Sequence, residues 1–90
     1  MTETPEARLK RMTMRSWRRG IKEMDLIFGR WSEAHLAGLD AEKLELYEAL
    51  LAEADQDIYP WITAAVPVPL RYAALIDEIR VFARANVSAG

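Results

Sequence analysis

Ninety residues are enough for one small domain with a thin core, and 51% hydrophobic with 29% charged residues is globular composition rather than that of a disordered chain. The absence of cysteine excludes disulfides, thiolate-bound metal and thiol nucleophiles, and a single histidine excludes a histidine-rich metal site. The net charge of −2 conceals a division, because seven of the twelve basic residues lie at positions 8–22, whereas positions 40–57 hold seven acidic residues and one lysine.

The first predicted helix begins at Thr4-Pro5-Glu6, which combines an N-cap residue, a proline at the first helical position and an early acid that suits the helix dipole. We expect this helix to continue to about Arg18. Gly20 then interrupts it, because glycine costs about 1 kcal/mol in a helix interior. The sequence therefore predicts a turn or kink between a first and a second helix.

Two further helices are predicted from apolar side chains at three- and four-residue steps, the period of a helix with one buried face. In the second helix these side chains are Ile21, Met24, Ile27, Phe28 and Trp31, with Leu36 and Leu39 continuing the apolar character. Asp40 is a good N-cap for a third helix. The buried stripe of that helix is expected to be Leu44, Tyr47, Leu50, Leu51 and Ala54.

The last third of the chain predicts two more helices, separated by a proline-rich link. Asp55-Gln56-Asp57 is a helix-start signal, and we expect Pro60 to lie close enough to that start to be tolerated. The residues before each proline of 66–69 are extended, and Pro69 is placed at the start of the last helix. The buried stripe of that helix is expected to be Tyr72, Leu75, Ile76, Ile79, Phe82 and Ala83.

The predicted fold is therefore all-α, a compact single domain of about five short helices over residues 1–90, with residues 1–4 and 86–90 frayed. The N-terminus lacks the apolar stretch of a secretory signal, and no apolar run approaches the ~20 residues of a membrane span. We expect a cytoplasmic protein that is monomeric when free and is not inserted into a membrane.

Catalytic and metal-binding groups are sparse in this sequence. Acid–base or nucleophilic catalysis needs a reactive side chain beside a partner that tunes it, and one histidine with three scattered serines forms no such arrangement. We expect His35 to be a half-buried packing or hydrogen-bonding residue. Asp55 and Asp57 are too few for a calcium loop, so helix capping is the favoured interpretation. The sequence predicts no enzyme and no metal site.

A stripe of basic side chains at three- and four-residue steps shares one helix face if the first helix persists, with Trp17 beside it. Its members are Arg8, Arg11, Arg15, Arg18 and Lys22. Three interpretations stay open: a solvated face, a contact with RNA or an anionic membrane, and docking on an acidic protein surface. The acidic middle of the chain and a pI near 5.4 count against a nucleic-acid partner. A generic helical interaction domain is a further alternative.

Arg19, Gly20 and Glu23 form a second pattern with two interpretations. The simpler one is a surface ion pair between Arg19 and Glu23 on one helix face, worth at most about 0.5 kcal/mol. The other is a docking motif, in which a glycine lets a partner backbone approach closely while the flanking arginine and glutamate form hydrogen bonds across the contact. The pattern alone does not decide between them.

Residues 18–26, Arg-Arg-Gly-Ile-Lys-Glu-Met-Asp-Leu, resemble the Arg-Gly-x-x-Glu signature of the small succinate dehydrogenase assembly factors that promote covalent attachment of FAD. Residues 44–51 are similar to the third helix of that family, and residues 55–61 match its Asp-x-Asp-aliphatic-aromatic-x-Trp block. Together the resembling blocks cover about residues 8–84. Their order and spacing extend the resemblance well beyond the signature.

The resemblance implies a five-helix fold, no cofactor of the factor's own, and a partner that is the flavoprotein subunit of succinate dehydrogenase, with fumarate reductase as a second candidate. FAD then belongs to the partner. The Arg-Gly-x-x-Glu segment is implied to be the contact surface, and the neighbouring basic residues are added to it. The expected partner-binding residues are Arg19, Gly20, Glu23, Arg15, Arg18 and Lys22.

Two positions depart from the family pattern. Ala64 stands where many relatives have glycine, and Pro60 lies inside the matching Asp-x-Asp block. Both positions lie outside the signature, so they bear on local turn geometry more than on function.

Overall fold

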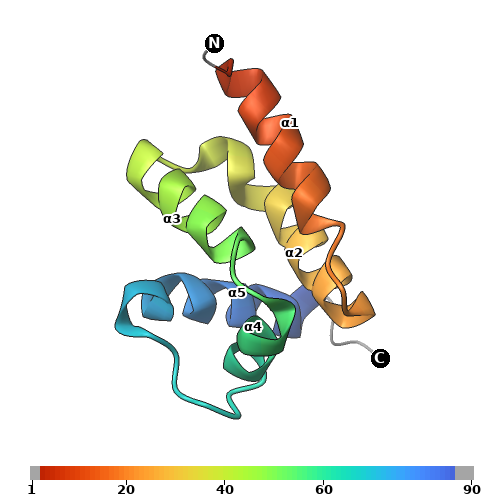
Figure 1. Ribbon diagram of the computed structural model, residues 1–90, viewed down its shortest axis with the longest axis vertical. Helices are drawn as coiled ribbons and strands as arrows, with labels where there is room; N and C mark the ends of the chain where they lie inside the picture. Colours follow the sequence, from red (N-terminus) through yellow and green to blue (C-terminus); the bar gives the residue numbers. More distant parts are fainter. Residues whose placement is uncertain (1–2, 87–90) are drawn as a thin grey trace.

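The computed structural model describes residues 3–86, which form five α-helices, two single turns of 3-10 helix and no strand (Figure 1). The helices are α1 (Pro5–Ser16), α2 (Lys22–His35), α3 (Ala41–Leu51), α4 (Asp55–Ile62) and α5 (Ala73–Asn86). The two turns are Leu36–Gly38 and Leu70–Tyr72. The prediction of an all-α fold with five short helices is confirmed. None of the helices in this part of the chain has the length and apolar character needed to cross a membrane.

Helix α2 lies between α1 and α5 (Figure 1). It packs against α1 and against α5, while α1 also contacts α3, and α5 also contacts α4. This arrangement brings the α1–α2 loop to the α3–α4 connection, so that residues 36 positions apart in sequence form hydrogen bonds. These two connections carry the candidate site.

The core contains most of the apolar side chains that the helical period predicts, whereas Leu44, Phe82 and Ala83 are half-buried at its edge. Phe28 and Trp31 of α2 pack on Tyr47 of α3, with ring centroids 6.2 and 4.8 Å from the Tyr47 ring. The other buried apolar residues are Met12, Met24, Ile27, Leu36, Leu50, Leu51, Ile58, Trp61, Tyr72, Leu75, Ile76 and Ile79. Ala54 was predicted to continue the buried stripe of the third helix, but α3 ends at Leu51 and Ala54 is exposed.

Polar atoms of Tyr47 and Ser16 are satisfied inside this core. The Tyr47 hydroxyl lies 2.7 Å from Ser16 Oγ and donates to the Phe28 carbonyl at 3.4 Å, and Ser16 donates to the Met12 carbonyl at 2.8 Å. Burial raises the pKa of the Tyr47 hydroxyl above its ordinary value, so it stays protonated. These bonds fix α1, α2 and α3 relative to one another.

Helix α1 ends at Ser16, two residues before the predicted end. The indole of Trp17 lies directly on Gly29 of α2, where a Cβ atom would overlap the ring, and its Nε1 donates to Glu33 at 2.9 Å. Beyond Trp17, the Arg19 amide donates to a side chain instead of to a helix carbonyl, so the helix does not continue. The predicted turn before the second helix is present, but it begins earlier.

The end of α4 explains one departure from the family pattern. Ala64 has φ of 64°, in the left-handed region that favours glycine. It is the first residue after the C-cap of α4, and the amides of Ala64 and Ala65 donate to the carbonyls of Trp61 and Pro60 at 3.3 and 2.8 Å. This is the hydrogen-bond pattern of a Schellman motif, whose central residue is usually glycine.

Three smaller predictions are corrected by the structure. Pro60 is the sixth residue of α4, beyond the first turn, and the helix ends two residues later. Pro69 caps the 3-10 turn before α5, which begins only at Ala73. The side chain of Thr4 accepts the Ala7 amide at 3.1 Å, and Asn86 is the last residue of α5, so the predicted fraying does not apply to these two. Residues 1–2 and 87–90 lie outside the part of the chain that the structure describes.

Candidate docking surface

The Arg19 side chain turns inward to the α3–α4 connection. Its Nη2 and Nε lie 2.6 and 2.7 Å from Asp55 Oδ1, and only 8% of the side chain is exposed. Nη1 donates to the Leu51 carbonyl at 2.7 Å and Nη2 to the Glu53 carbonyl at 3.0 Å. Carbonyls at the C-terminal end of a helix lack partners within the helix, and an arginine there satisfies them. Arg19 therefore attaches the α1–α2 loop to the end of α3.

Gly20 continues this attachment through its backbone. Its amide donates to Asp55 Oδ2, while the Arg19 amide donates to the carboxylate of Asp25. A Cβ atom at position 20 would lie 2.9 Å from Asp55 Oδ2, closer than such atoms normally approach. The missing side chain of Gly20 thus makes room for the Asp55 carboxylate, and the residue itself is exposed.

Asp55 was predicted to cap its own helix, and this interpretation is wrong. Ala54 is the N-cap of α4, with no side-chain capping bond, and Asp55 is the first helical residue. Its negative charge still suits the positive end of the helix dipole. The carboxylate oxygens, however, bind Arg19 and Gly20 on the other connection.

Glu23 lies exposed in the first turn of α2. It does not form the intrahelical pair with Arg19 that the spacing suggested, because Arg19 precedes the helix and binds Asp55. The Tyr59 hydroxyl of α4 donates to Glu23 Oε1 at 3.3 Å, and the negative charge of Glu23 raises the pKa of Tyr59. Glu23 is therefore exposed to solvent, and within residues 3–86 its side chain accepts one weak hydrogen bond, from Tyr59.

The six predicted partner-binding residues divide into two groups. Those exposed on the surface are Arg18, Gly20, Lys22 and Glu23. Arg15 and Arg19 face the protein, and Arg15 Nη2 lies 3.5 Å from the Leu51 carbonyl. We call residues 18–23 the docking segment; four of its six residues are exposed, while Arg19 and Ile21 are directed toward the protein.

The basic stripe is not one continuous face, because α1 ends before Arg18. Both Arg8 and Arg11 bind Glu48 of α3, with nitrogen–oxygen distances of 2.7 and 2.6 Å. Hydrogen bonds from these guanidinium groups hold the pKa of Glu48 below its ordinary value, and the bond from Arg11 has the larger effect. Two of the five stripe members are thus neutralised within the molecule.

A groove of about 380 Å³ begins beside Glu23. Its walls come from α2, the end of α4 and α5, and its lining is largely apolar. The lining residues are Glu23, Leu26, Ile27, Ile62, Thr63, Ala64, Arg80, Ala83 and Arg84. The docking segment therefore adjoins a largely apolar hollow that Glu23, Arg80 and Arg84 also line.

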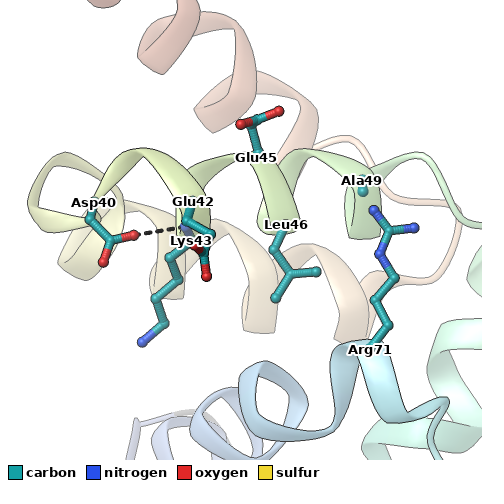
Figure 2. A pocket seen from close by; sticks show the side chains of 7 residues that line it. All are labelled: Asp40, Glu42, Lys43, Glu45, Leu46, Ala49 and Arg71. Carbon is teal, nitrogen blue, oxygen red and sulfur yellow. Dashed lines mark hydrogen bonds between the residues drawn. The ribbon is translucent and has the colours of Figure 1, made fainter.

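A larger hollow of about 680 Å³ lies between α3 and the turn before α5 (Figure 2). Its lining is mostly charged: Asp40, Glu42, Lys43 and Glu45 come from α3 and its N-cap, and Arg71 extends from the turn before α5 toward Ala49. Asp40 caps α3 through the Lys43 amide at 2.8 Å, as predicted. None of the predicted partner-binding residues lines this hollow, and its side chains form no arrangement typical of a catalytic site.

His35 is exposed rather than half-buried, although it does pack as predicted. Its ring stacks on Trp31 with centroids 5.1 Å apart and meets the Phe82 ring edge-on at 5.3 Å. Its position at the end of α2 leaves one side of the ring to solvent.

Sequence reasoning missed Asp55, Asp25 and Tyr59 as parts of this site. Each contacts the docking segment from another element or a later turn. Asp55 carried a signal, because it opens the Asp-x-Asp block that resembles the assembly-factor family. The local pattern predicts a helix cap, and neighbouring residues carry no signal for the long-range bonds to Arg19 and Gly20.

Residues 10–83 match a protein family described as the flavinator of succinate dehydrogenase. The chain is 40% identical over 73 residues to a protein of Meyerozyma guilliermondii, covering 78% of this chain and 54% of that protein. It is 38% identical over 87 residues to a protein of Yarrowia lipolytica, covering 91% and 58%. A protein of Candida glabrata is 37% identical over 75 residues, covering 80% and 49%.

All three relatives are named succinate dehydrogenase assembly factor 2, mitochondrial. The chain spans about half the length of these curated relatives. Their names place them in mitochondria, so they do not confirm the cytoplasmic location predicted for this chain.

Proposed function

Because this chain belongs to the family described as the flavinator of succinate dehydrogenase, we propose that it is an assembly factor that binds the flavoprotein subunit of succinate dehydrogenase and promotes covalent attachment of FAD. The observation that carries the proposal is the family match over residues 10–83. The exposed docking segment supports it, since Gly20 and Glu23 are accessible to a partner. Fumarate reductase is proposed as a second partner of the same kind.

The covalent attachment of FAD takes place on the flavoprotein, and its chemistry determines what this chain has to contribute. Joining a ring methyl carbon of the flavin to a histidine breaks a methyl C–H bond and forms a C–N bond, and the flavin ring itself takes up the two electrons and is left reduced. The step requires a neutral imidazole and an acceptor for the methyl proton. Both groups belong to the flavoprotein in this proposal. The present chain holds no FAD of its own and supplies no catalytic side chain. It accelerates the step by stabilising a partner conformation in which histidine and flavin meet in a productive geometry.

Within the docking segment, the exposed residues are proposed to make the direct contacts. Gly20 offers an exposed stretch of backbone to the partner, Glu23 accepts hydrogen bonds from the partner, and Arg18 and Lys22 supply positive charge. Arg15 and Arg19 support this edge from below. The free factor is proposed to be a monomer that meets the flavoprotein in the compartment where that subunit folds.

The test uses the purified flavoprotein subunit without covalent flavin, mixed with FAD and this chain. We expect a complex on size-exclusion chromatography and a rise in protein-bound flavin fluorescence after denaturation. Glu23→Ala should weaken both by about tenfold, the size expected for one charge-assisted contact. Glu42→Ala is the matched control, because Glu42 occupies the same second position of its own helix and is also exposed. No complex and no added flavin with the unaltered chain would contradict the proposal.

The alternative of a basic-helix adaptor for RNA or anionic membranes has lost part of its support, since Arg8 and Arg11 bind Glu48. Titrating salt against binding to RNA and to anionic vesicles tests it directly. Tight, strongly salt-dependent binding there, without binding to the flavoprotein, would favour the adaptor. Binding to none of these partners would leave a generic helical interaction domain.

A further inference from the structure

The carboxylate of Asp55 holds two neighbouring residues of the docking segment at once. Oδ1 accepts from the Arg19 guanidinium, and Oδ2 accepts from the Gly20 amide. We infer that Asp55 is a positioning residue for the docking segment, and that Arg19 acts through this contact without touching the partner. The inference rests on the proposed function and changes the role of the motif's arginine from a contact to a support.

Arg19 is poorly placed to contact another protein. Each of its three guanidinium nitrogens is bonded: Nε and Nη2 to Asp55, Nη1 to the Leu51 carbonyl, and Nη2 also to the Glu53 carbonyl. Only 8% of its side chain is exposed. A partner carboxylate would have to displace an ion pair and two carbonyls to reach the guanidinium fork. The same bonds make Arg19 suited to fixing the loop.

The fold of the free chain already requires glycine at position 20, before any partner binds. The Asp55 carboxylate occupies the space beside the Gly20 Cα, where an added Cβ would lie 2.9 Å from Oδ2. With its amide held by Asp55, Gly20 is nevertheless exposed to solvent. Glu23 is the second residue of the next helix, only three residues after Gly20, so fixing Gly20 also sets where Glu23 points. A loop fixed in advance loses less conformational entropy on docking.

The test compares Asp55→Ala and Asp55→Asn with Asp57→Ala in binding to the flavoprotein subunit. Asp57 is the matched control, an exposed aspartate in the same first turn of α4. We expect Asp55→Ala to weaken binding about tenfold or more and Asp57→Ala to change it by less than about twofold. Asp55→Asn should lie between them, since the amide keeps one acceptor oxygen but loses the charge.

A general loss of stability is separated from positioning by a core variant. Ile76 is fully buried in α5, on a different helix from the docking segment, so Ile76→Val and Ile76→Ala supply chains with lowered melting temperatures. At equal melting temperature, these variants should bind as the unaltered chain does while Asp55→Ala does not. Equal loss of binding in both would overturn the inference, and so would full binding by Asp55→Ala.

The amide of Gly20 gives a readout that needs no partner. In the ¹⁵N-labelled full chain, Asp55→Ala should move the Gly20 amide proton upfield and accelerate its hydrogen exchange, while Ile76→Val and Asp57→Ala leave its shift in place. An unchanged Gly20 amide in Asp55→Ala would overturn the inference. If the unaltered chain fails to bind the flavoprotein, the proposed function fails, and this amide measurement still decides whether Asp55 positions the segment.

Discussion

Replacing Ala64 by glycine is expected to stabilise the protein. Ala64 has φ of 64° at the end of α4, and an L-residue with a Cβ costs about 1–2 kcal/mol in that region. Glycine removes this cost but loses about 0.5–1 kcal/mol more conformational freedom on folding than alanine does. The difference predicts a net gain of about 0.5–1 kcal/mol in the free energy of unfolding. The Schellman hydrogen bonds of Ala64 and Ala65 need no side chain and should be retained.

Thermal and urea denaturation followed by circular dichroism measure this gain. For a domain of this size it should raise the melting temperature by about 2–8 °C. Ala65→Gly is the matched control, because the next residue of the same turn does not have a positive φ. Glycine there should leave stability unchanged or lower it. A melting temperature of Ala64→Gly at or below that of the unaltered chain would refute the reasoning, as would an equal gain from Ala65→Gly.

Two further substitutions test the packing and the charges. Gly29→Ala should force the Trp17 ring off α2, because the alanine Cβ would overlap the indole. Overpacking costs about 1–3 kcal/mol and alanine gains about 1 kcal/mol in helix propensity, so urea denaturation should show a net loss of up to about 2 kcal/mol in the free energy of unfolding. Unchanged stability would contradict that contact. Arg11 and Arg8 lower the pKa of Glu48 in the folded state, so these pairs stabilise the protein above the ordinary pKa of 4.5, and the contribution is lost as pH falls through the lower folded value. Glu48→Gln should therefore reduce the free energy of unfolding by about 0.5–1 kcal/mol at pH 7 and by almost nothing near pH 2. A difference in stability between this variant and the unaltered chain that stays the same from pH 7 to pH 2 would argue against the ion pairs.

Most of the fold could be predicted because the signals for it are local. Thr4 and Asp40 cap α1 and α3 through side-chain bonds to amides three residues on, as their positions before apolar stripes indicated. The apolar period placed the helices, and the core residues follow it closely. The helix ends were less predictable. The end of α1 depends on bonds to Asp25 and on the contact between Trp17 and Gly29.

The candidate site could be predicted only as a segment, not as a geometry. The resemblance identified Arg19, Gly20 and Glu23, and the family match over residues 10–83 confirmed the family. The partner-binding role of these residues stays a prediction until the flavoprotein is tested. Spacing suggested that Arg19 pairs with Glu23, whereas Arg19 binds Asp55, 36 residues away.

The sequence by itself determined the helices, their buried faces and the segment that identifies the family, because caps, helical period and signature are properties of neighbouring residues. Only the tertiary structure decided that Arg19 supports the docking segment while Gly20 and Glu23 remain exposed. The reason is that an aspartate before an apolar stretch looks the same in sequence whether it caps its own helix or binds a distant loop. The packing of α1 and α3 brings that loop within reach of Asp55.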